Sequence, residues 1–433
     1  MRVRSLRTRL AALAPARRAT LLVVALAVVV QLLVLARIRL TAVGPQGGDL
    51  CQDVVAVHRM LRGQNPYVRL SACGPLAFSL HPPFSLLVVA PFAVWPVAVA
   101  GLLWDVASLG MLALALALIT RELRLTLQPA YLALLLGLLI FWPPLLDTLL
   151  EAQMSLALLL LLTLAWRWSR HERPALAGSA LGLAAALRLF PALAALYFLL
   201  RRDRKALVGM AASFLAASLL ALPFVGIDGY KSLIGNSVPN TSAAWGRSPH
   251  NASLWGFADH LIAGSGAGRV GFVLVAAYLA SLAVVTWRNR GRASRDDALT
   301  LLMYYPAMLL VSPLGWQYYF VFLLPPVIVV AHAVGWLGGP ARSSLSQRAL
   351  SGIRGLLLAF LTLLWLYHMP FVVSFLGENS ATRATLPTFA LLALAGALAI
   401  LATAGHVAPD SLLPQTRALE DQVSFPVPPS VTR

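Results

Sequence analysis

The chain of 433 residues is 59% hydrophobic and only 12% charged, and its mean hydropathy is +0.78. Because soluble globular domains carry about a quarter charged residues, this composition excludes an ordinary soluble protein. The formal net charge of +18 does not indicate nucleic-acid binding, because the basic residues are spread over short loops between apolar runs, where they set membrane topology.

Continuous apolar runs recur along the chain, and many reach about 18 residues, enough to cross the hydrocarbon core of a bilayer. The runs do not alternate with polar residues, which favours helices over a transmembrane barrel. The sequence therefore predicts an all-α, polytopic integral membrane protein.

The first elements define the orientation of the chain in the membrane. Residues 1–18 form a basic segment, and the first predicted span covers 19–38, which is too long to be a cleaved signal peptide. Basic residues near spans favour the cytoplasmic side. The N-terminus is therefore predicted in the cytoplasm on the strength of Arg2, Arg4, Arg7, Arg9, Arg17 and Arg18.

Later basic loops are also predicted in the cytoplasm. They cover 121–124, 167–173, 201–205, 288–292 and the segment with Arg342, Arg348 and Arg354. The external side then receives 41–96, 145–153, 226–268, 313–317 and 376–385.

Residues 174–200 connect two basic loops that are predicted on the same side. We therefore expect a hairpin of two short helices that bends near Arg188 and Pro191, since proline interrupts a helix. The alternative is one straight helix, which would put the two basic loops on opposite sides. The apolar stretch 84–96 is too short to cross, and we expect it in the outer interface.

These assignments give about twelve transmembrane helices, with both termini inside and short amphipathic helices in the external loops. The membrane domain spans 19–405. The polar, proline-rich tail 406–433 is expected to be cytoplasmic and disordered.

The first external loop contains the stretch GGDLCQDVVAVHRMLRGQNPY, residues 47–67. From 49 to 61 it predicts an amphipathic helix with Val54, Val57 and Leu61 on one face. Gly63 and Pro66 then end the helix. The chain's two cysteines, Cys51 and Cys73, also lie in this loop. Outside the cytoplasm they can form a disulfide around QNPY, and two free buried thiols are the alternative.

Most of the unusual polar residues fall in the external segments. A partly desolvated pocket between these loops could combine a general base with a cation for a phosphate group. Any single external carboxylate is more simply read as a solvated loop residue, so the function must be inferred from the group as a whole.

Several motifs occur in a fixed order: D-x3-D-x9-G-Q-N-P-Y from Asp49, H-P-P-F from His81, A-Q-M-S-L from Ala152, G-L-A-A-A-L-R-L-F-P around Arg188, and S-P-L-G-W-Q-Y-Y from Ser312. In this order they resemble glycosyltransferase family 87 (DUF2029), which belongs to the GT-C class of membrane glycosyltransferases. The resemblance covers residues 47–320.

The resemblance implies an inverting transfer of a sugar from a polyprenol-phosphate donor at the external face. In the family the catalytic acid stands fourteen positions before the glycine of the G-x-x-P-Y turn, which here selects Asp49 before Gly63. Asp53 is the second candidate. Arg188 stands where the family often has lysine, and its planar fork suits a donor phosphate. Because a charge inside the membrane costs about 2.5–3.5 kcal/mol, Arg188 should meet an anion or reach the interface.

The remaining candidates follow from the same resemblance and from the external loops. Arg247 is a second candidate for the donor phosphate. The sequence departs from the family where His81 replaces tyrosine, around Glu151, and after the tryptophan of the late turn. The candidate substrate-binding residues are Asn65, Tyr67, His81, Glu151, Gln153, His250, Asn251, Trp316, Gln317 and Tyr318.

The predicted function is therefore a hexosyltransferase, resembling polyprenol-phosphate-mannose-dependent mannosyltransferases, that glycosylates a lipid or lipid-linked glycan. The expected location is the plasma membrane of a bacterium, with membrane lipids as partners and no nucleic acid. No cofactor or metal is expected, because no metal-holding acid pair stands near Asp49. A polytopic transporter or flippase for a lipid or solute is the alternative, although it should carry polar residues at span midplanes.

Overall fold

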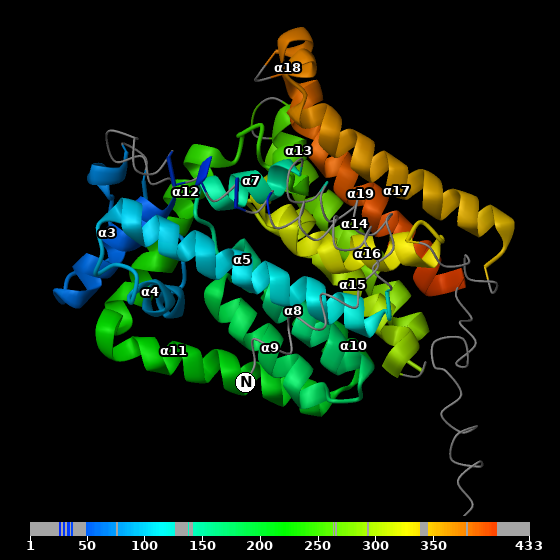
Figure 1. Cartoon of the computed structure of the whole chain (residues 1–433), viewed down its shortest axis with the longest axis horizontal. Helices are drawn as coiled ribbons and strands as arrows, with labels where there is room; N and C mark the ends of the chain where they lie inside the picture. The colour runs from blue at the N-terminus through cyan, green and yellow to red at the C-terminus, as the bar shows by residue number, and fades with distance from the viewer. Residues whose placement is uncertain are drawn as a thin grey trace, which may run out of the picture.

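The computed structural model describes residues 49–404 except 75–76, 126–136, 138–141, 263, 265, 292–293, 338–344 and 378–379, and a few helical positions between 26 and 37 (Figure 1). Several predicted segments lie wholly or mostly outside the described residues. These are the basic N-terminus 1–18, the first span 19–38, residues 41–48 of the first loop, Arg342 and the tail 406–433.

The described elements are helical, and their one strand-like contact is a backbone bridge between Asn251 and Trp316. Five described helical segments are long and apolar enough to cross a membrane. They are α5 (Val97–Glu122), α11 (Arg204–Ser232) continued by η3 (Leu233–Ser237) and α12 (Val238–Trp245), α14 (Gly266–Asn289), α17 (Gln347–His368) and α19 (Ala381–Ala404). The all-α membrane fold is confirmed, and the total of about twelve spans stays a prediction.

Shorter helices fill the space between these long ones. They are α8 (Ser155–Arg170), α9 (Pro174–Leu187), η2 (Phe190–Leu193), α10 (Ala194–Arg201), α15 (Ser294–Val311), η4 (Gln317–Leu323) and α16 (Leu324–Ala333). The side chains of η4 and α16 are almost all buried, so this segment lies in the core of the bundle.

Helices α9 and α11 pack closely and run in the same direction. Gly178 of α9 faces Ala206 of α11, and four residues later Gly182 faces Met210. A Cβ atom at Gly178 would lie 1.9 Å from the carbonyl oxygen of Ala206. Small residues therefore allow this close approach between helix backbones, as is common in membrane bundles.

The parallel packing of α9 and α11 settles the path between them. The chain must return along η2 and α10 to the end where α9 began. The basic segments 167–173 and 201–205 therefore lie at the same end of the bundle. This confirms the hairpin and excludes one straight helix through 174–200.

Short helices lie in the connections: α3 (Asp49–Leu61), η1 (Ser71–Cys73), α4 (Pro83–Val89), α7 (Pro143–Leu150), α13 (Leu254–Leu261) and α18 (Pro370–Leu376). In Figure 1, α3 and α4 lie at the left end and α18 projects at the top. The amphipathic helix α3 has the predicted bounds and buries Val54 and Val57. Leu61 is 57% exposed because the helix ends there and Gly63 turns the chain with a φ of +69°.

The apolar stretch 84–96 is only partly helical. Only α4 is a regular helix, and turns follow before α5 begins. Leu86 and Val89 are fully buried, and α4 packs against α9 and α11. One face of α4 is therefore packed against the protein, whereas Val94 and Trp95 in the second half of the stretch are 75% and 52% exposed. The location of the stretch in the outer interface stays a prediction.

Candidate active site

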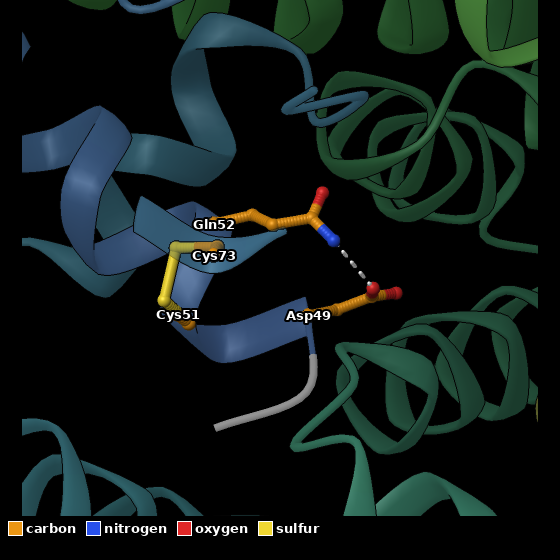
Figure 2. The surroundings of a disulfide bond; sticks show 4 residues. All are labelled: Asp49, Cys51, Gln52 and Cys73. Atoms are coloured by element: carbon orange, nitrogen blue, oxygen red, sulfur yellow. Dashed lines mark hydrogen bonds between the residues drawn. A yellow bond between two sulfur atoms is a disulfide. The ribbon is translucent and has the colours of Figure 1, made fainter. Parts of the chain in front are cut away.

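Asp49 is the first residue of α3, where the partial positive charge of a helix N-terminus favours a carboxylate. Its carboxylate accepts hydrogen bonds from the side-chain amide of Gln153 and from Gln52 Nε2 at 3.1 Å. The Tyr318 hydroxyl lies 3.4 Å from the same carboxylate. Figure 2 shows Gln52 reaching back to Asp49 next to the Cys51–Cys73 disulfide. Three segments that are distant in sequence therefore meet at one acid.

Gln153 connects Asp49 to Arg188. Its Nε2 donates to Asp49, and its Oε1 accepts from Arg188 Nη2 at 3.1 Å. The side chain is 1% exposed. A buried amide with both ends bonded has one preferred orientation, so Gln153 holds the acid and the guanidinium at a set separation.

Arg188 stands at the end of α9, where the backbone becomes extended with φ −148° and ψ 135°. The residue is 7% exposed, and its guanidinium carbon lies 5.4 Å from the ring centroid of Tyr319. Its Nε is buried without a hydrogen-bond partner. Among the residues that the structure describes, Arg188 forms no ion pair. A buried guanidinium that lacks an ion-pair partner favours the binding of an anion.

The electrostatic surroundings of Asp49 suit a base. Burial raises the pKa of its carboxyl above the ordinary value, and the Arg188 guanidinium opposes this with a downward pull on the same pKa. The hydrogen bond from Gln153 also lowers the pKa. A carboxylate with a raised pKa accepts a proton more readily than a solvated one.

Asp53, one turn after Asp49, has a different environment. It is 2% exposed, and its carboxylate contacts Nδ1 of His81, which is 3% exposed. The Tyr67 hydroxyl donates to the His81 carbonyl at 2.8 Å. Asp53 therefore orients His81, whereas Asp49 bonds to Gln153 in the network that leads to Arg188.

The two cysteines form a disulfide between α3 and η1. Of the two alternatives left open by the sequence, the structure thus contains the bond and not the free thiols. It closes a loop over a sequence separation of 22 residues, which includes QNPY. The bond ties the first turn of α3, which carries Asp49, to the segment that leads to His81.

These groups border one cavity of about 560 Å³, a volume typical of small-molecule sites. Its walls include Asp49, Gln52, Asp53, Cys73, His81, Asp147, Glu151, Arg188, Thr241, Trp245, His250, Trp316, Gln317 and Tyr318. Six of the predicted substrate-binding residues are therefore brought together here: His81, Glu151, His250, Trp316, Gln317 and Tyr318.

Asn65 and Tyr67 do not line the cavity. Asn65 Oδ1 accepts from the Tyr67 backbone N–H at 2.9 Å, and its amide nitrogen donates to Ser232 Oγ at 2.7 Å. The Tyr67 carbonyl accepts from Asn236 at 2.8 Å. Both residues anchor the QNPY turn against the end of α11 and η3.

Asn251 and Arg247 also lie outside the cavity wall. Asn251 is 1% exposed and lies outside the cavity wall. Its amide nitrogen donates to the Pro313 carbonyl at 3.0 Å, and its Oδ1 accepts from the Gly315 N–H at 2.8 Å. It therefore shapes the turn before Trp316. Arg247 is exposed and does not line the cavity, so the structure does not bring it to Arg188.

The sequence interpretation did not assign Gln52, Trp245 or Tyr319. Gln52 follows Asp49 by three residues, a spacing that makes neighbours on a helix, so this signal was available. Trp245 and Tyr319 reach the site because α12 ends and η4 begins beside it, which no local pattern indicates. Within the described residues, no group of three or more His, Cys, Asp or Glu side chains could hold a metal ion. That the reaction needs no metal stays a prediction.

Comparison with known proteins adds a family relationship. Residues 80–313, more than half of the chain, match the family model described as glycosyltransferase family 87. Asp49, Asp53 and the disulfide precede the matched segment. No solved structure matches.

Curated relatives come from mycobacteria. A Mycobacterium tuberculosis (strain CDC 1551 / Oshkosh) protein is 30% identical over 67% of this chain and 65% of its own length, and is named polyprenol-phosphate-mannose-dependent alpha-(1-2)-phosphatidylinositol pentamannoside mannosyltransferase. A relative of the same name from Mycolicibacterium smegmatis is 29% identical over 60% of this chain and 62% of its own length. An M. tuberculosis H37Rv phosphatidylinositol mannoside mannosyltransferase is 35% identical over 41% of this chain and 40% of its own length. The chain thus spans less than two thirds of each of these relatives.

Proposed function

Because the chain belongs to glycosyltransferase family 87, we propose that it is a membrane mannosyltransferase that uses a polyprenol-phosphate-mannose donor. The names of the relatives support this donor, and they favour a phosphatidylinositol mannoside or a similar lipid-linked glycan as the acceptor. The observation that carries the proposal is the network of Asp49, Gln153 and Arg188 at one cavity, since it combines a base with an unpaired cation.

Asp49 acts as the general base. Its carboxylate takes the proton of the acceptor hydroxyl while the hydroxyl oxygen attacks the anomeric carbon of the donor sugar. A bond forms between that oxygen and the anomeric carbon as the bond from the carbon to the phosphate oxygen breaks. The leaving polyprenyl phosphate keeps the electron pair, and attack from the opposite face inverts the anomeric centre. The raised pKa of Asp49 supports this role.

Arg188 holds the donor phosphate and stabilises the charge that grows on it in the transition state. A donor group aimed at developing charge in a water-poor site contributes about 2.7–4 kcal/mol in comparable enzymes. Gln153 sets the separation between Arg188 and the base, so it is a positioning residue. With an arginine in this role, the proposed reaction uses no metal or cofactor, and the sugar donor is a co-substrate.

The proposed location is the plasma membrane of a bacterium, with the site and the loop 226–268 outside and both termini inside. The disulfide supports an external site, because such bonds persist outside the reducing cytoplasm. The basic segments 167–173 and 201–205, which share one end of the bundle, support a cytoplasmic end. Membrane lipids are the proposed surroundings, and nucleic acid is not a partner.

Transfer of radiolabelled mannose from polyprenol-phosphate-mannose to membrane lipids tests the proposal. Membranes with the wild-type chain should label a glycolipid, and Asp49→Asn should lower the rate by about 10²–10⁴-fold, the usual contribution of a general base. Asp228→Asn is the matched control, because the Asp228 side chain is 92% exposed and, among the described residues, pairs only with Lys231 at 3.5 Å. Full activity in Asp49→Asn would reject Asp49 as the base and make Asp53 the next candidate. A wild-type chain that transfers neither mannose nor another polyprenol-phosphate sugar would favour the transporter alternative.

A further inference from the structure

One wall of the cavity is aromatic. It is formed by Trp245 at the end of α12, Trp316 before η4, and Tyr318 within η4. The Trp316 and Tyr318 rings are nearly parallel, with an interplanar angle of 13° and centroids 6.0 Å apart. Trp245 meets Trp316 edge-on at 6.0 Å and 64°. We call these three residues the aromatic wall.

The aromatic wall begins at the proposed base. The Tyr318 hydroxyl lies 3.4 Å from Asp49 Oδ2, while Trp245 is 41% exposed. The wall therefore leads from the reacting centre towards a more open part of the cavity. Arg188 is joined to Asp49 through Gln153 and lies against Tyr319. Since Arg188 is assigned to the donor phosphate, the aromatic wall is left for the other substrate.

Polar groups accompany the aromatic wall in the same cavity. Asp147, Glu151 and His250 line it as well. A sugar ring has an apolar C–H face and a rim of hydroxyl groups. The C–H face packs on the negative face of an aromatic ring, and carboxylates and imidazoles accept or donate hydrogen bonds at the rim. A lipid chain could pack on the rings but would offer no hydrogen-bonding groups to the polar side chains that line the same cavity.

From this arrangement we propose that the aromatic wall is the acceptor-sugar subsite. The sugar that receives the new linkage stacks on Trp316 and Tyr318 with a hydroxyl directed to Asp49, and the preceding sugar or inositol ring packs on Trp245. The acceptor is therefore a glycolipid recognised through its sugar rings, and a lipid without sugar is a poor ligand. This inference rests on the proposed function, because it takes Asp49 as the group that meets the acceptor.

Binding tests the subsite without the need for turnover. Purified full-length protein in nanodiscs is titrated with a fluorescent phosphatidylinositol dimannoside and with the matching phosphatidylinositol that lacks sugar. The wild type should bind the dimannoside more tightly. Trp245→Ala and Trp316→Ala should each weaken that binding about three- to tenfold, the value of one aromatic contact, and leave the binding of phosphatidylinositol unchanged.

Two variants distinguish a sugar-stacking role of Trp245 from a purely structural role. Trp245→Phe keeps an aromatic face and should restore most of the affinity. Trp365→Ala is the control, because Trp365 is 40% exposed, almost the same as Trp245, but does not line the cavity. Equal affinity of the wild type for both lipids, or a Trp245→Ala protein that still prefers the dimannoside as strongly as the wild type, would overturn the inference.

The two proposals can fail separately. If the subsite is right but the proposed function is wrong, the preference for the dimannoside and its dependence on Trp245 persist, but the mannose-transfer assay shows no product. If the function holds and the subsite is wrong, transfer occurs and Trp245→Ala leaves the KM for the acceptor unchanged. If both hold, Trp245→Ala raises the KM for the acceptor and leaves the KM for the donor at its wild-type value.

Discussion

At the scale of single residues, the site separates two carboxylates that lie one helical turn apart. Asp49 bonds to amides and borders the cavity beside an unpaired guanidinium, whereas Asp53 is bonded to His81. Because their partners differ, the two carboxylates have different roles, although the D-x3-D motif does not distinguish them. Gln153 makes the difference, because its amide joins Asp49 to Arg188 and reaches neither Asp53 nor His81.

The pH dependence of transfer tests this arrangement. Asp49 must be ionised to act as a base, and its pKa in the folded protein is raised by burial. Activity should therefore be present at high pH and fall as the pH drops through that raised pKa, so the acid limb of kcat/KM lies above the ordinary Asp value of about 3.9.

Gln153→Leu provides the sharper form of the pH test. It removes a hydrogen bond that lowers the pKa of Asp49, so the pKa rises and the acid limb moves to higher pH. Asn240→Leu is a control, because Asn240 is exposed and, within the part of the chain that the structure describes, its side chain bonds only to Asn236. An acid limb that stays in place in Gln153→Leu would contradict the assignment of Asp49 as the titrating base.

At the scale of elements, α3 is held by a covalent bond as well as by packing. The disulfide joins its first turn to η1, and both α3 and Cys73 border the cavity. The position of Asp49 thus depends on a link that exists only under oxidising conditions.

Replacement of both cysteines by serine should destabilise the protein by about 3 kcal/mol, the loop-entropy value for a closed loop of this length. The midpoint of thermal unfolding, measured in detergent, should therefore fall. The wild type treated with reductant should show the same decrease, while reductant should have no further effect on the double-serine variant. An unchanged midpoint in that variant would mean that packing alone holds α3.

The parallel pair of α9 and α11 supports Arg188, which directly follows α9. Gly178→Ala would place a methyl group 1.9 Å from the Ala206 carbonyl oxygen, so the helices must move apart. We expect a loss of about 1–3 kcal/mol, typical of overpacking, seen as a lower midpoint of thermal unfolding. Gly110→Ala in α5 is the control, since a Cβ there meets no atom within 4 Å. Equal midpoints for the two variants would contradict the close packing.

At the scale of the whole molecule, the bundle has two distinct ends. The basic segments 167–173 and 201–205 lie at one end, and at the other the chain brings together α3, α7, α12 and the turn before η4 around the cavity. This separation suits an enzyme that receives both lipid substrates at one membrane surface.

Cysteine labelling tests which surface that is. The native cysteines are bonded to each other, so an introduced cysteine is the reactive thiol among the described residues. Ala243→Cys in α12, beside the cavity, should react with a membrane-impermeant maleimide in intact cells. Lys205→Cys at the start of α11 should react only after permeabilisation. Both positions are exposed. The opposite pattern would place the cavity in the cytoplasm and reject the external site.

The sequence by itself determined the features that depend on local patterns. Hydropathy indicated the helical membrane class, and period and turn residues gave α3 its bounds. Pro191 and the two flanking basic loops predicted the hairpin at 174–200, which the parallel packing of α9 and α11 confirms. The resemblance carried by the ordered motifs also singled out Asp49 and Arg188, which the structure joins through Gln153.

Only the tertiary structure decided which side chains meet. Asp49 and Tyr318 are 269 positions apart, and their contact depends on how α3 and η4 pack across the bundle. Packing between distant helices also places α4 against α9 and α11, directs the Asn251 side chain to the turn before Trp316, and leaves Arg247 outside the cavity. Hydropathy and turn signals act over a few residues, whereas these outcomes arise from contacts between distant helices, so no local pattern could specify them.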